Sequence, residues 1–273
     1  MQRLRNTFDD LWAALIFFTR LPWWRLHQVE AGHFRQAAQY WPFAGWLTGG
    51  TMATTFCLAS LILPYATSLL LALGARLLLT GALHEDGLAD FCDGMGGGRD
   101  RQHTLSIMKD SHIGTFGVLG LIFYFLGMYN ILPCIVEYFA PQNNELALHD
   151  IVPQICTLML TSDVWSKCCA ALLTAQLPYA RREEEAKARV VYAPMQWGWQ
   201  ALRTLLSMSP IVALWLWLDW MPHPLALVAS LMTELLLMLW LRRRLGGYTG
   251  DCCGATFLLC EGSFYLTTAL LGH

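Results

Sequence analysis

Seven long apolar segments constrain the fold of this chain more than any other feature. Each is long enough for a transmembrane helix, which needs about 20 mainly apolar residues. The chain is 55% hydrophobic and 14% charged, whereas soluble domains carry about 25% charged residues. We predict an all-α, polytopic transmembrane helix bundle that forms one domain over the whole chain. The predicted spans are residues 37–63, 65–83, 113–137, 151–174, 198–220, 224–241 and 252–271.

The loops between these segments alternate in basic charge. The loops 138–150 and 220–224 hold no Lys or Arg. Because basic loops stay in the cytoplasm, the alternation predicts a cytoplasmic N-terminus and a C-terminus on the outer side. The segments that hold nearly all of the Lys and Arg residues, and are therefore predicted to be cytoplasmic, are 1–36, 84–112, 175–197 and 242–250.

The N-terminal stretch 8–26, FDDLWAALIFFTRLPWWRL, is apolar but short and interrupted. Trp23 and Trp24 follow Pro22, and Arg20 lies close to them. Trp and Arg side chains favour the level of the lipid headgroups. The stretch therefore predicts an interfacial or re-entrant helix, with a full span as the alternative.

Three aspartates follow the second apolar segment at helical spacing. Asp86, Asp90 and Asp93 stand at i, i+4 and i+7, so a helix would place them on one stripe. Without a partner, each neighbouring pair would repel by roughly 3 kcal/mol at an effective dielectric constant of about 20. A hard divalent cation such as Mg²⁺ removes this repulsion, and a solvated acidic helix face is the alternative. We predict a metal site, with Asp110 or Asp251 completing it.

A second segment with functional character is Arg242–Asp251, RRRLGGYTGD, which precedes the last apolar segment. Arginines hold phosphates, and backbone N–H groups of a Gly-rich turn can bind an anion. Membrane anchoring explains the arginines but neither the glycines nor Asp251. Because this turn and the aspartates fall on the same predicted side, we expect them to converge in one cavity. Asp251 should then lie within about 15 Å of Asp90, the reach of a diphosphate and its metal shell.

Charged residues also occur inside the apolar segments. Asp163 and Lys167 form an i, i+4 pair in the order that favours a salt bridge. A charge pair within a span indicates either a functional site or a self-neutralising structural pair. Arg76 lies inside the second span and either reaches the headgroups or faces the site.

The remaining cytoplasmic segment, 179–189, reads YARREEEAKAR and predicts a charged helix. Arg181 and Arg182 could reach an anionic substrate from it. The net charge of −2 argues against a nucleic-acid partner. Carboxylates, a Gly-rich turn and arginines on one side of a bilayer indicate metal-dependent chemistry on a phosphorylated substrate.

The sequence resembles the cobalamin-5′-phosphate synthase family, also named adenosylcobinamide-GDP ribazoletransferase, over nearly its whole length. The region Pro42–Gly45 also matches the family. Gly254, Ala255 and Glu261, which follow the LGGYTGD motif, match it as well. Glu85, His112 and Lys167 depart from the family pattern. The motifs that carry the resemblance are FTRLP (Phe18–Pro22), TGALHEDGLADFCDG (Thr80–Gly94), MKDSHIGTFG (Met108–Gly117) and LGGYTGD (Leu245–Asp251).

This resemblance implies an Mg²⁺-dependent enzyme of the bacterial inner membrane, with its C-terminus in the periplasm. It would join α-ribazole or its 5′-phosphate to adenosylcobinamide-GDP, release GMP and form adenosylcobalamin or its 5′-phosphate. Association with other enzymes of cobalamin synthesis is expected to accompany this role. The candidate catalytic residues are Asp86, Asp90, Asp93 and Asp110, and the candidate metal ligands are these four with Asp251 and Glu261. The candidate substrate-binding residues are Arg20, His84, Lys109, Ser111, Lys167, Arg181, Gly246, Gly247, Thr249 and Gly250.

Two other functions fit parts of the pattern. A CDP-alcohol phosphotransferase-like enzyme also uses an aspartate-rich helix, but its arginine-bearing aspartate motif does not occur here. A secondary transporter could use the intramembrane Asp163 and Glu261 as an ion relay. The concentration of acidic residues in a Gly-rich loop argues against a transporter, and no inverted repeat is evident.

Overall fold

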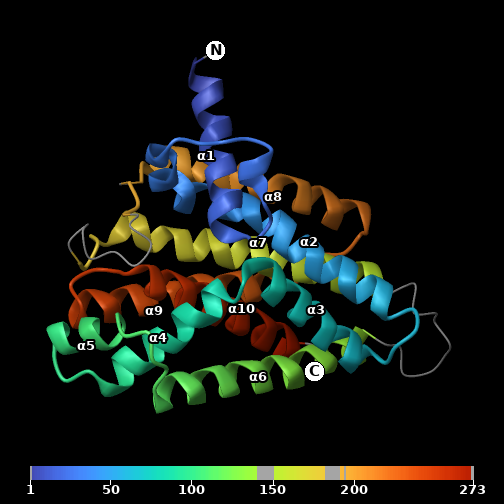
Figure 1. The fold of residues 1–273 in the computed structure, drawn as a ribbon. Helices are drawn as coiled ribbons and strands as arrows, with labels where there is room; N and C mark the ends of the chain where they lie inside the picture. Colours follow the sequence, from blue (N-terminus) through green and yellow to red (C-terminus); the bar gives the residue numbers. More distant parts are fainter. Residues whose placement is uncertain (1, 140–150, 182–190, 194, 272–273) are drawn as a thin grey trace.

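The computed structural model describes residues 2–139, 151–181, 191–193 and 195–271, and this part of the chain is helical throughout (Figure 1). Two short 3₁₀ helices, η1 (Trp23–Arg25) and η2 (Ala31–Tyr40), accompany the α-helices. The α-helices are α1 (Gln2–Phe18), α2 (Trp41–Ala59), α3 (Tyr65–Thr80), α4 (Leu83–Gly97), α5 (Arg101–Ile107), α6 (Thr115–Phe139), α7 (Val152–Gln176), α8 (Trp197–Trp217), α9 (Pro224–Arg244) and α10 (Gly250–Leu271). The predicted all-α bundle is confirmed.

Each of the seven predicted spans corresponds to one helix, namely α2, α3 and α6 to α10. Four of the described helices, α6, α7, α9 and α10, are long and apolar enough to cross a membrane on their own. The pair α3 and α4 passes the same test as one unit that bends by 89°. The helices α2 and α8 do not pass it, because Gly, Thr and Trp lower their hydropathy. The number of crossings therefore stays a prediction.

The sharp bend between α3 and α4 depends on one glycine. Gly81 ends α3 with φ +66°, and Ala82 follows with φ +56°. A left-handed backbone favours glycine, and the side chain of Arg20 also lies where a side chain on Gly81 would stand. The turn directs α4 away from α3 and lays it along α10. This contact positions the aspartate-bearing helix.

The helices approach one another closely where glycines replace larger residues. An added side-chain carbon at Gly87 on α4 would lie 3.1 Å from the carbonyl oxygen of Asp251 on α10. One at Gly254 on α10 would lie 3.2 Å from the carbonyl oxygen of His84. Gly45 brings α2 equally close to α7, since its added carbon would lie 3.0 Å from the α-carbon of Val164. Small residues at such crossings are typical of membrane helix packing.

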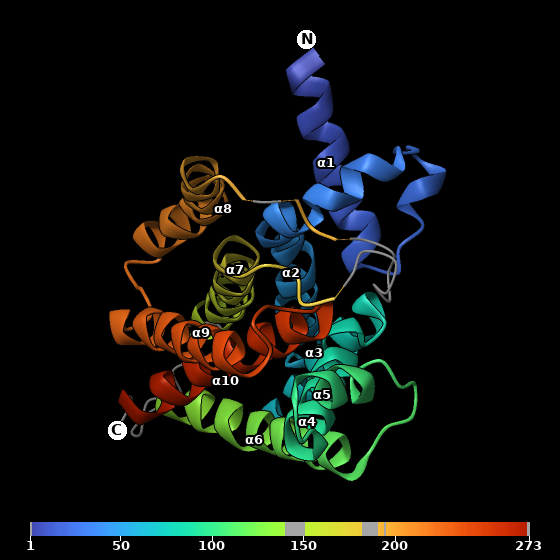
Figure 2. The same ribbon diagram turned by 90° about the vertical axis from the view of Figure 1, so that its left-hand side faces the viewer.

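The N-terminal part forms a separate unit at the edge of the bundle. Figures 1 and 2 show that α1 runs across the direction of α7 and projects away from the other helices. The carboxylate of Asp9 lies 2.7 Å from the ring of His27, and that of Asp10 lies 2.7 Å from the ring of His33. These contacts fold the segment after Phe18 back along α1. α1 is not among the helices long and apolar enough to cross a membrane on their own, and the choice between an interfacial helix and a span stays a prediction.

Large apolar side chains cover the outside of the bundle. Ile62 is 84% exposed, Leu78 81%, Phe123 74% and Leu216 79%. A soluble protein rarely exposes so much apolar surface, so these helices fit a membrane protein. Figure 1 also shows α5, the end of α7 and the turn between α9 and α10 together at the left end of the bundle. Described parts of three of the four predicted basic segments thus lie at this end, whereas α1 lies across the middle of the bundle in this view.

Candidate active site

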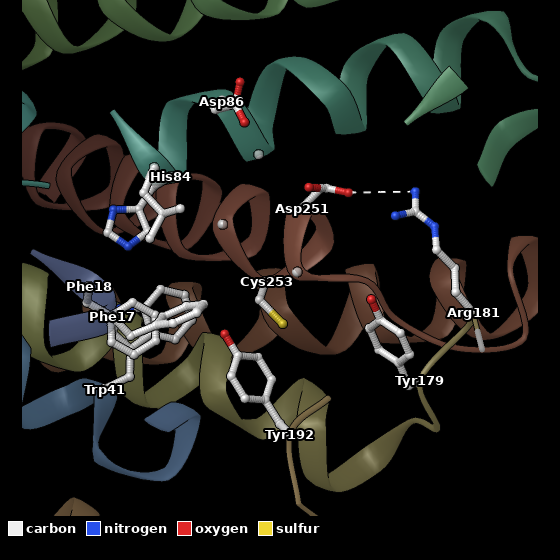
Figure 3. Close-up of a pocket in the computed structure, with 14 residues that line it drawn as sticks. Phe17, Phe18, Trp41, His84, Asp86, Tyr179, Arg181, Tyr192, Asp251 and Cys253 are labelled. Atoms are coloured by element: carbon white, nitrogen blue, oxygen red, sulfur yellow. Dashed lines mark ion pairs between the residues drawn. The ribbon is translucent and has the colours of Figure 1, made fainter. Parts of the chain in front are cut away.

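A cavity of about 290 Å³ opens between α4, α10 and the ends of α1 and α2 (Figure 3). Its size is near the lower limit of small-molecule sites in proteins. One end is acidic and the other is aromatic. The lining residues are Phe17, Phe18, Trp41, Leu83, His84, Asp86, Gly87, Tyr179, Arg181, Tyr192, Gly250, Asp251, Cys253 and Gly254.

The acidic end consists of two aspartates from different helices. Asp86 extends from α4 and Asp251 stands in the first turn of α10, and Figure 3 shows them on neighbouring walls. Arg181 lies 3.9 Å from the carboxylate of Asp251, which also accepts a hydrogen bond from Thr249 at 3.2 Å. The predicted convergence is confirmed, because Gly87 packs directly against the backbone of Asp251.

Aromatic residues border this acidic end. Burial raises the pKa of the Tyr179 phenol, so the hydroxyl remains protonated at neutral pH and can donate a hydrogen bond. Tyr192 lies farther along the same wall (Figure 3). No motif in the sequence indicated either tyrosine, because both belong to the connection between α7 and α8. Arg182, predicted beside Arg181, lies outside the described residues.

Asp93 has a structural role in α6. Its two carboxylate oxygens accept hydrogen bonds from the backbone N–H groups of Gly114 at 2.7 Å and Gly117 at 2.8 Å. A carboxylate at the start of α6 accepts hydrogen bonds from its free N–H groups and stabilises the positive end of the helix dipole. Asp93 is seven residues further along α4 than Asp86, about 10 Å along the helix axis, and it does not line the cavity that Asp86 enters.

We expect Asp93→Asn to lower the free energy of unfolding by about 1–3 kcal/mol, because an amide offers one neutral acceptor for two buried donors. Denaturant unfolding in detergent measures this effect. Asp100→Asn is the matched control, since Asp100 caps α5 through the N–H of His103 and asparagine caps equally well. Equal stability of wild type and Asp93→Asn would show that Asp93 does not hold α6.

The other predicted acidic ligands also lie away from the cavity lining. Asp90 is buried one turn after Asp86. Asp110 is exposed, and two hydrogen bonds from His112, at 3.0 Å and 2.7 Å, lower its pKa. In the described part of the chain, no three His, Cys, Asp or Glu side chains are grouped so that they could hold one metal ion. The structure therefore does not assemble the predicted aspartates into one ligand set.

Glu261 and Lys167 belong to a buried charge cluster beneath the cavity. Glu261 is ion-paired with Arg76 and accepts a hydrogen bond from Tyr124 at 2.9 Å. Lys167 forms the predicted salt bridge with Asp163 and donates to Thr48 at 2.8 Å. Arg76 also lies 3.5 Å from Asp163. Two cations thus balance two anions, which gives Glu261 and Lys167 partners other than a metal or a substrate and favours the self-neutralising interpretation.

The Gly-rich turn mostly serves chain packing. Gly246 has φ +63°, and its N–H donates to the carbonyl of Leu241. Gly247 lies against the backbone of Pro178, and the N–H of Tyr248 donates to that carbonyl at 2.9 Å. The N–H groups of Gly246 and Tyr248 are thus already paired within the protein, and the predicted anion nest stays a prediction for the other N–H groups of the turn. Thr249 begins α10 by accepting from the N–H of Cys252 at 3.3 Å.

Of the turn residues, only Gly250 lines the cavity, together with Asp251. Arg20 borders a separate hollow with Trp24 and Gly81. Lys109 and Arg181 line a third, basic hollow beside α5. Ser111 is exposed near the start of α6. The structure therefore brings together five of the predicted substrate-binding or metal-binding positions in one cavity, namely His84, Asp86, Arg181, Gly250 and Asp251.

The fold and the cavity define a helical membrane protein whose acidic site includes residues that follow the basic segment Arg242–Arg244 and its turn. The chain belongs to the cobalamin-5-phosphate synthase family, whose family model matches residues 10–269. It is 34% identical to the adenosylcobinamide-GDP ribazoletransferase of Vibrio cholerae over 99% of this chain and 97% of the relative. The enzymes of the same name from Shewanella amazonensis and Ralstonia pickettii are 34% and 33% identical, over 99% and 93% of this chain and 98% and 92% of theirs. No solved structure matches the chain.

Proposed function

We propose that this protein is an adenosylcobinamide-GDP ribazoletransferase. It joins α-ribazole, or its 5′-phosphate, to adenosylcobinamide-GDP and releases GMP. The observation that carries the proposal is the meeting of Asp86 and Asp251 in one cavity beside Arg181. Relatives of that printed name match nearly the whole chain, which supports the substrates.

We further propose that Asp86 and Asp251 hold Mg²⁺. The two carboxylates come from different helices and share one cavity, where Arg181 is the only cation among the lining residues. Mg²⁺ is usually bound by one or two carboxylates together with substrate phosphates, so two protein ligands suffice. When bound, the ion would neutralise the diphosphate and stabilise the departing GMP.

The residues around the aspartates would orient the diphosphate. Arg181 can donate two parallel hydrogen bonds to a phosphate, and the protonated Tyr179 can donate one more. A hydroxyl of α-ribazole attacks the phosphorus that carries the cobinamide. The bond from this phosphorus to the oxygen of GMP then breaks, and a carboxylate of the cavity accepts the hydroxyl proton.

The location of the substrates fits the predicted orientation. Gly250 and Asp251 of the cavity directly follow the basic segment Arg242–Arg244 and its turn, and basic segments are retained in the cytoplasm. We propose that the cavity faces the cytoplasm from the bacterial inner membrane, where soluble nucleotides such as GMP can leave.

The function is tested with purified protein in detergent, adenosylcobinamide-GDP and α-ribazole. We expect one GMP for each corrinoid product, no reaction after chelation of Mg²⁺, and recovery when Mg²⁺ is added. Omission of α-ribazole is the control, since a transferase without its acceptor should release little GMP. Release of GMP at the same rate without α-ribazole would identify a hydrolase, and no release in any condition would refute the proposal.

A further inference from the structure

The aromatic end of the cavity is a stacked wall of rings. Phe18 and Trp41 lie parallel, with ring centroids 4.8 Å apart and an angle of 7°. His84 stacks on Trp41 at 5.4 Å and 21°. Phe17 and Leu83 complete this end, and Figure 3 shows the rings together below His84 and away from the two aspartates. The rings stack mainly on one another, since Phe18 is 3% and Trp41 2% exposed, and they form the apolar end of the cavity lining.

The wall carries two buried polar groups without a hydrogen-bond partner, the indole N–H of Trp41 and the imidazole of His84. The position of His84 is the more unusual of the two. It is only 2% exposed, and neither of its ring nitrogens has a hydrogen-bond partner. An unpaired buried polar group costs about 1–3 kcal/mol, so native proteins retain few of them without a reason. A ligand that enters the cavity can supply the missing partner. The stacked wall and the unpaired nitrogens thus point to the same occupant.

We propose that this wall binds the base of α-ribazole, an inference that rests on the proposed function. The base is a fused, planar heteroaromatic ring system with two methyl groups and one free ring nitrogen. Its faces and methyl groups match the apolar rings of Phe18 and Trp41, and stacking on aromatic rings is how proteins hold free bases. Its free nitrogen can accept a hydrogen bond from an N–H of His84.

The other aromatic group of the reaction fits this wall less well. Guanine carries several donors and acceptors along its edge, and burying them without partners is costly. Among Phe17, Phe18, Trp41, Leu83 and His84, only the imidazole of His84 and the indole N–H of Trp41 could pair with them, which leaves most of the guanine edge without partners.

Binding of the base at this wall would also place the two substrates next to each other along α4. His84 and Asp86 are two residues apart on this helix, so the base and the diphosphate would occupy neighbouring positions. Gly87 and Gly254 cross between the two ends and leave no side chain in the way. With the base on the wall, the ribose hydroxyls point toward the acidic end, where the phosphorus is attacked.

Trp41→Leu tests the stacking. Because a base–aromatic stack contributes about 1–3 kcal/mol, the KM for α-ribazole should rise roughly five- to hundredfold, while the KM for adenosylcobinamide-GDP stays unchanged. Trp41→Phe should restore most of the affinity. Trp46→Leu is the matched control on the same helix, since Trp46 donates to the carbonyl of Ser207 and does not line the cavity.

His84→Phe tests the hydrogen bond separately. It keeps a ring of similar shape and removes two unpaired nitrogens, so the thermal midpoint should not fall. The KM for α-ribazole should nevertheless rise several-fold, as expected for one lost hydrogen bond. A fall in the midpoint with no change in this KM would show that His84 serves packing alone.

Equilibrium dialysis with α-ribazole separates the inference from the proposed function, because binding is measured without turnover. If wild type binds α-ribazole and Trp41→Leu binds it more weakly, the inference is supported even when no GMP release is observed. Two results overturn it: unchanged α-ribazole binding in Trp41→Leu, or a rise in the KM for adenosylcobinamide-GDP instead, which would assign the wall to guanine. Absence of wild-type α-ribazole binding would also overturn it.

Discussion

Asp251→Asn is expected to lower kcat at least about a hundredfold, the usual effect of removing one group that stabilises a transition state. The carboxylate faces the cavity beside Asp86 and Arg181. Asparagine keeps its size but binds Mg²⁺ more weakly, because it lacks the charge. Asp86→Asn should have a similar effect, and both variants should need a higher Mg²⁺ concentration. GMP release at a series of Mg²⁺ concentrations measures both quantities.

Two further variants make this test specific. Asp219→Asn is the control, since Asp219 is exposed between α8 and α9, away from the cavity, and asparagine tolerates its φ of +48°. Asp110→Asn distinguishes two interpretations. The sequence predicts Asp110 as a metal ligand, whereas the structure places it outside the cavity. If Asp110→Asn abolishes turnover while Asp251→Asn keeps it, the site is not the cavity described here.

Arg76→Met should destabilise the protein by about 3–5 kcal/mol, the cost of leaving a buried charge without its partner. Arg76 is 1% exposed and contacts both Glu261 and Asp163. Removal of Arg76 leaves Lys167 as the remaining cation in this cluster to balance the buried carboxylates of Asp163 and Glu261. Chemical unfolding in detergent measures the loss, and activity per folded molecule should change much less, because none of these residues lines the cavity.

The double variant Arg76→Met with Glu261→Gln provides the matched comparison. It removes one charge of each sign and restores the balance between Asp163 and Lys167, which are paired. We expect it to recover most of the lost stability, since neutral replacements of buried pairs are often well tolerated. A double variant no more stable than Arg76→Met would mean that Arg76 acts by packing and not by charge.

The bundle was largely readable from the sequence. Apolar segments near 20 residues indicate membrane helices whatever their partners, so the seven predicted spans each correspond to a helix. The Asp163–Lys167 salt bridge was also readable, because i, i+4 geometry within one helix needs no tertiary information. The convergence of Asp86 and Asp251 followed from the alternation of basic loops, which assigns both to one end of the bundle.

The roles of individual aspartates were decided by tertiary structure alone. The spacing of Asp86, Asp90 and Asp93 is the same whether one cation binds all three or each has its own partner. The partners of Asp93 are N–H groups more than twenty residues away, and Glu261 meets Arg76 across 185 residues. The aromatic wall likewise joins α1, α2 and α4. Sequence periodicity reports which residues share a face of one helix, whereas a site depends on which faces of different helices meet.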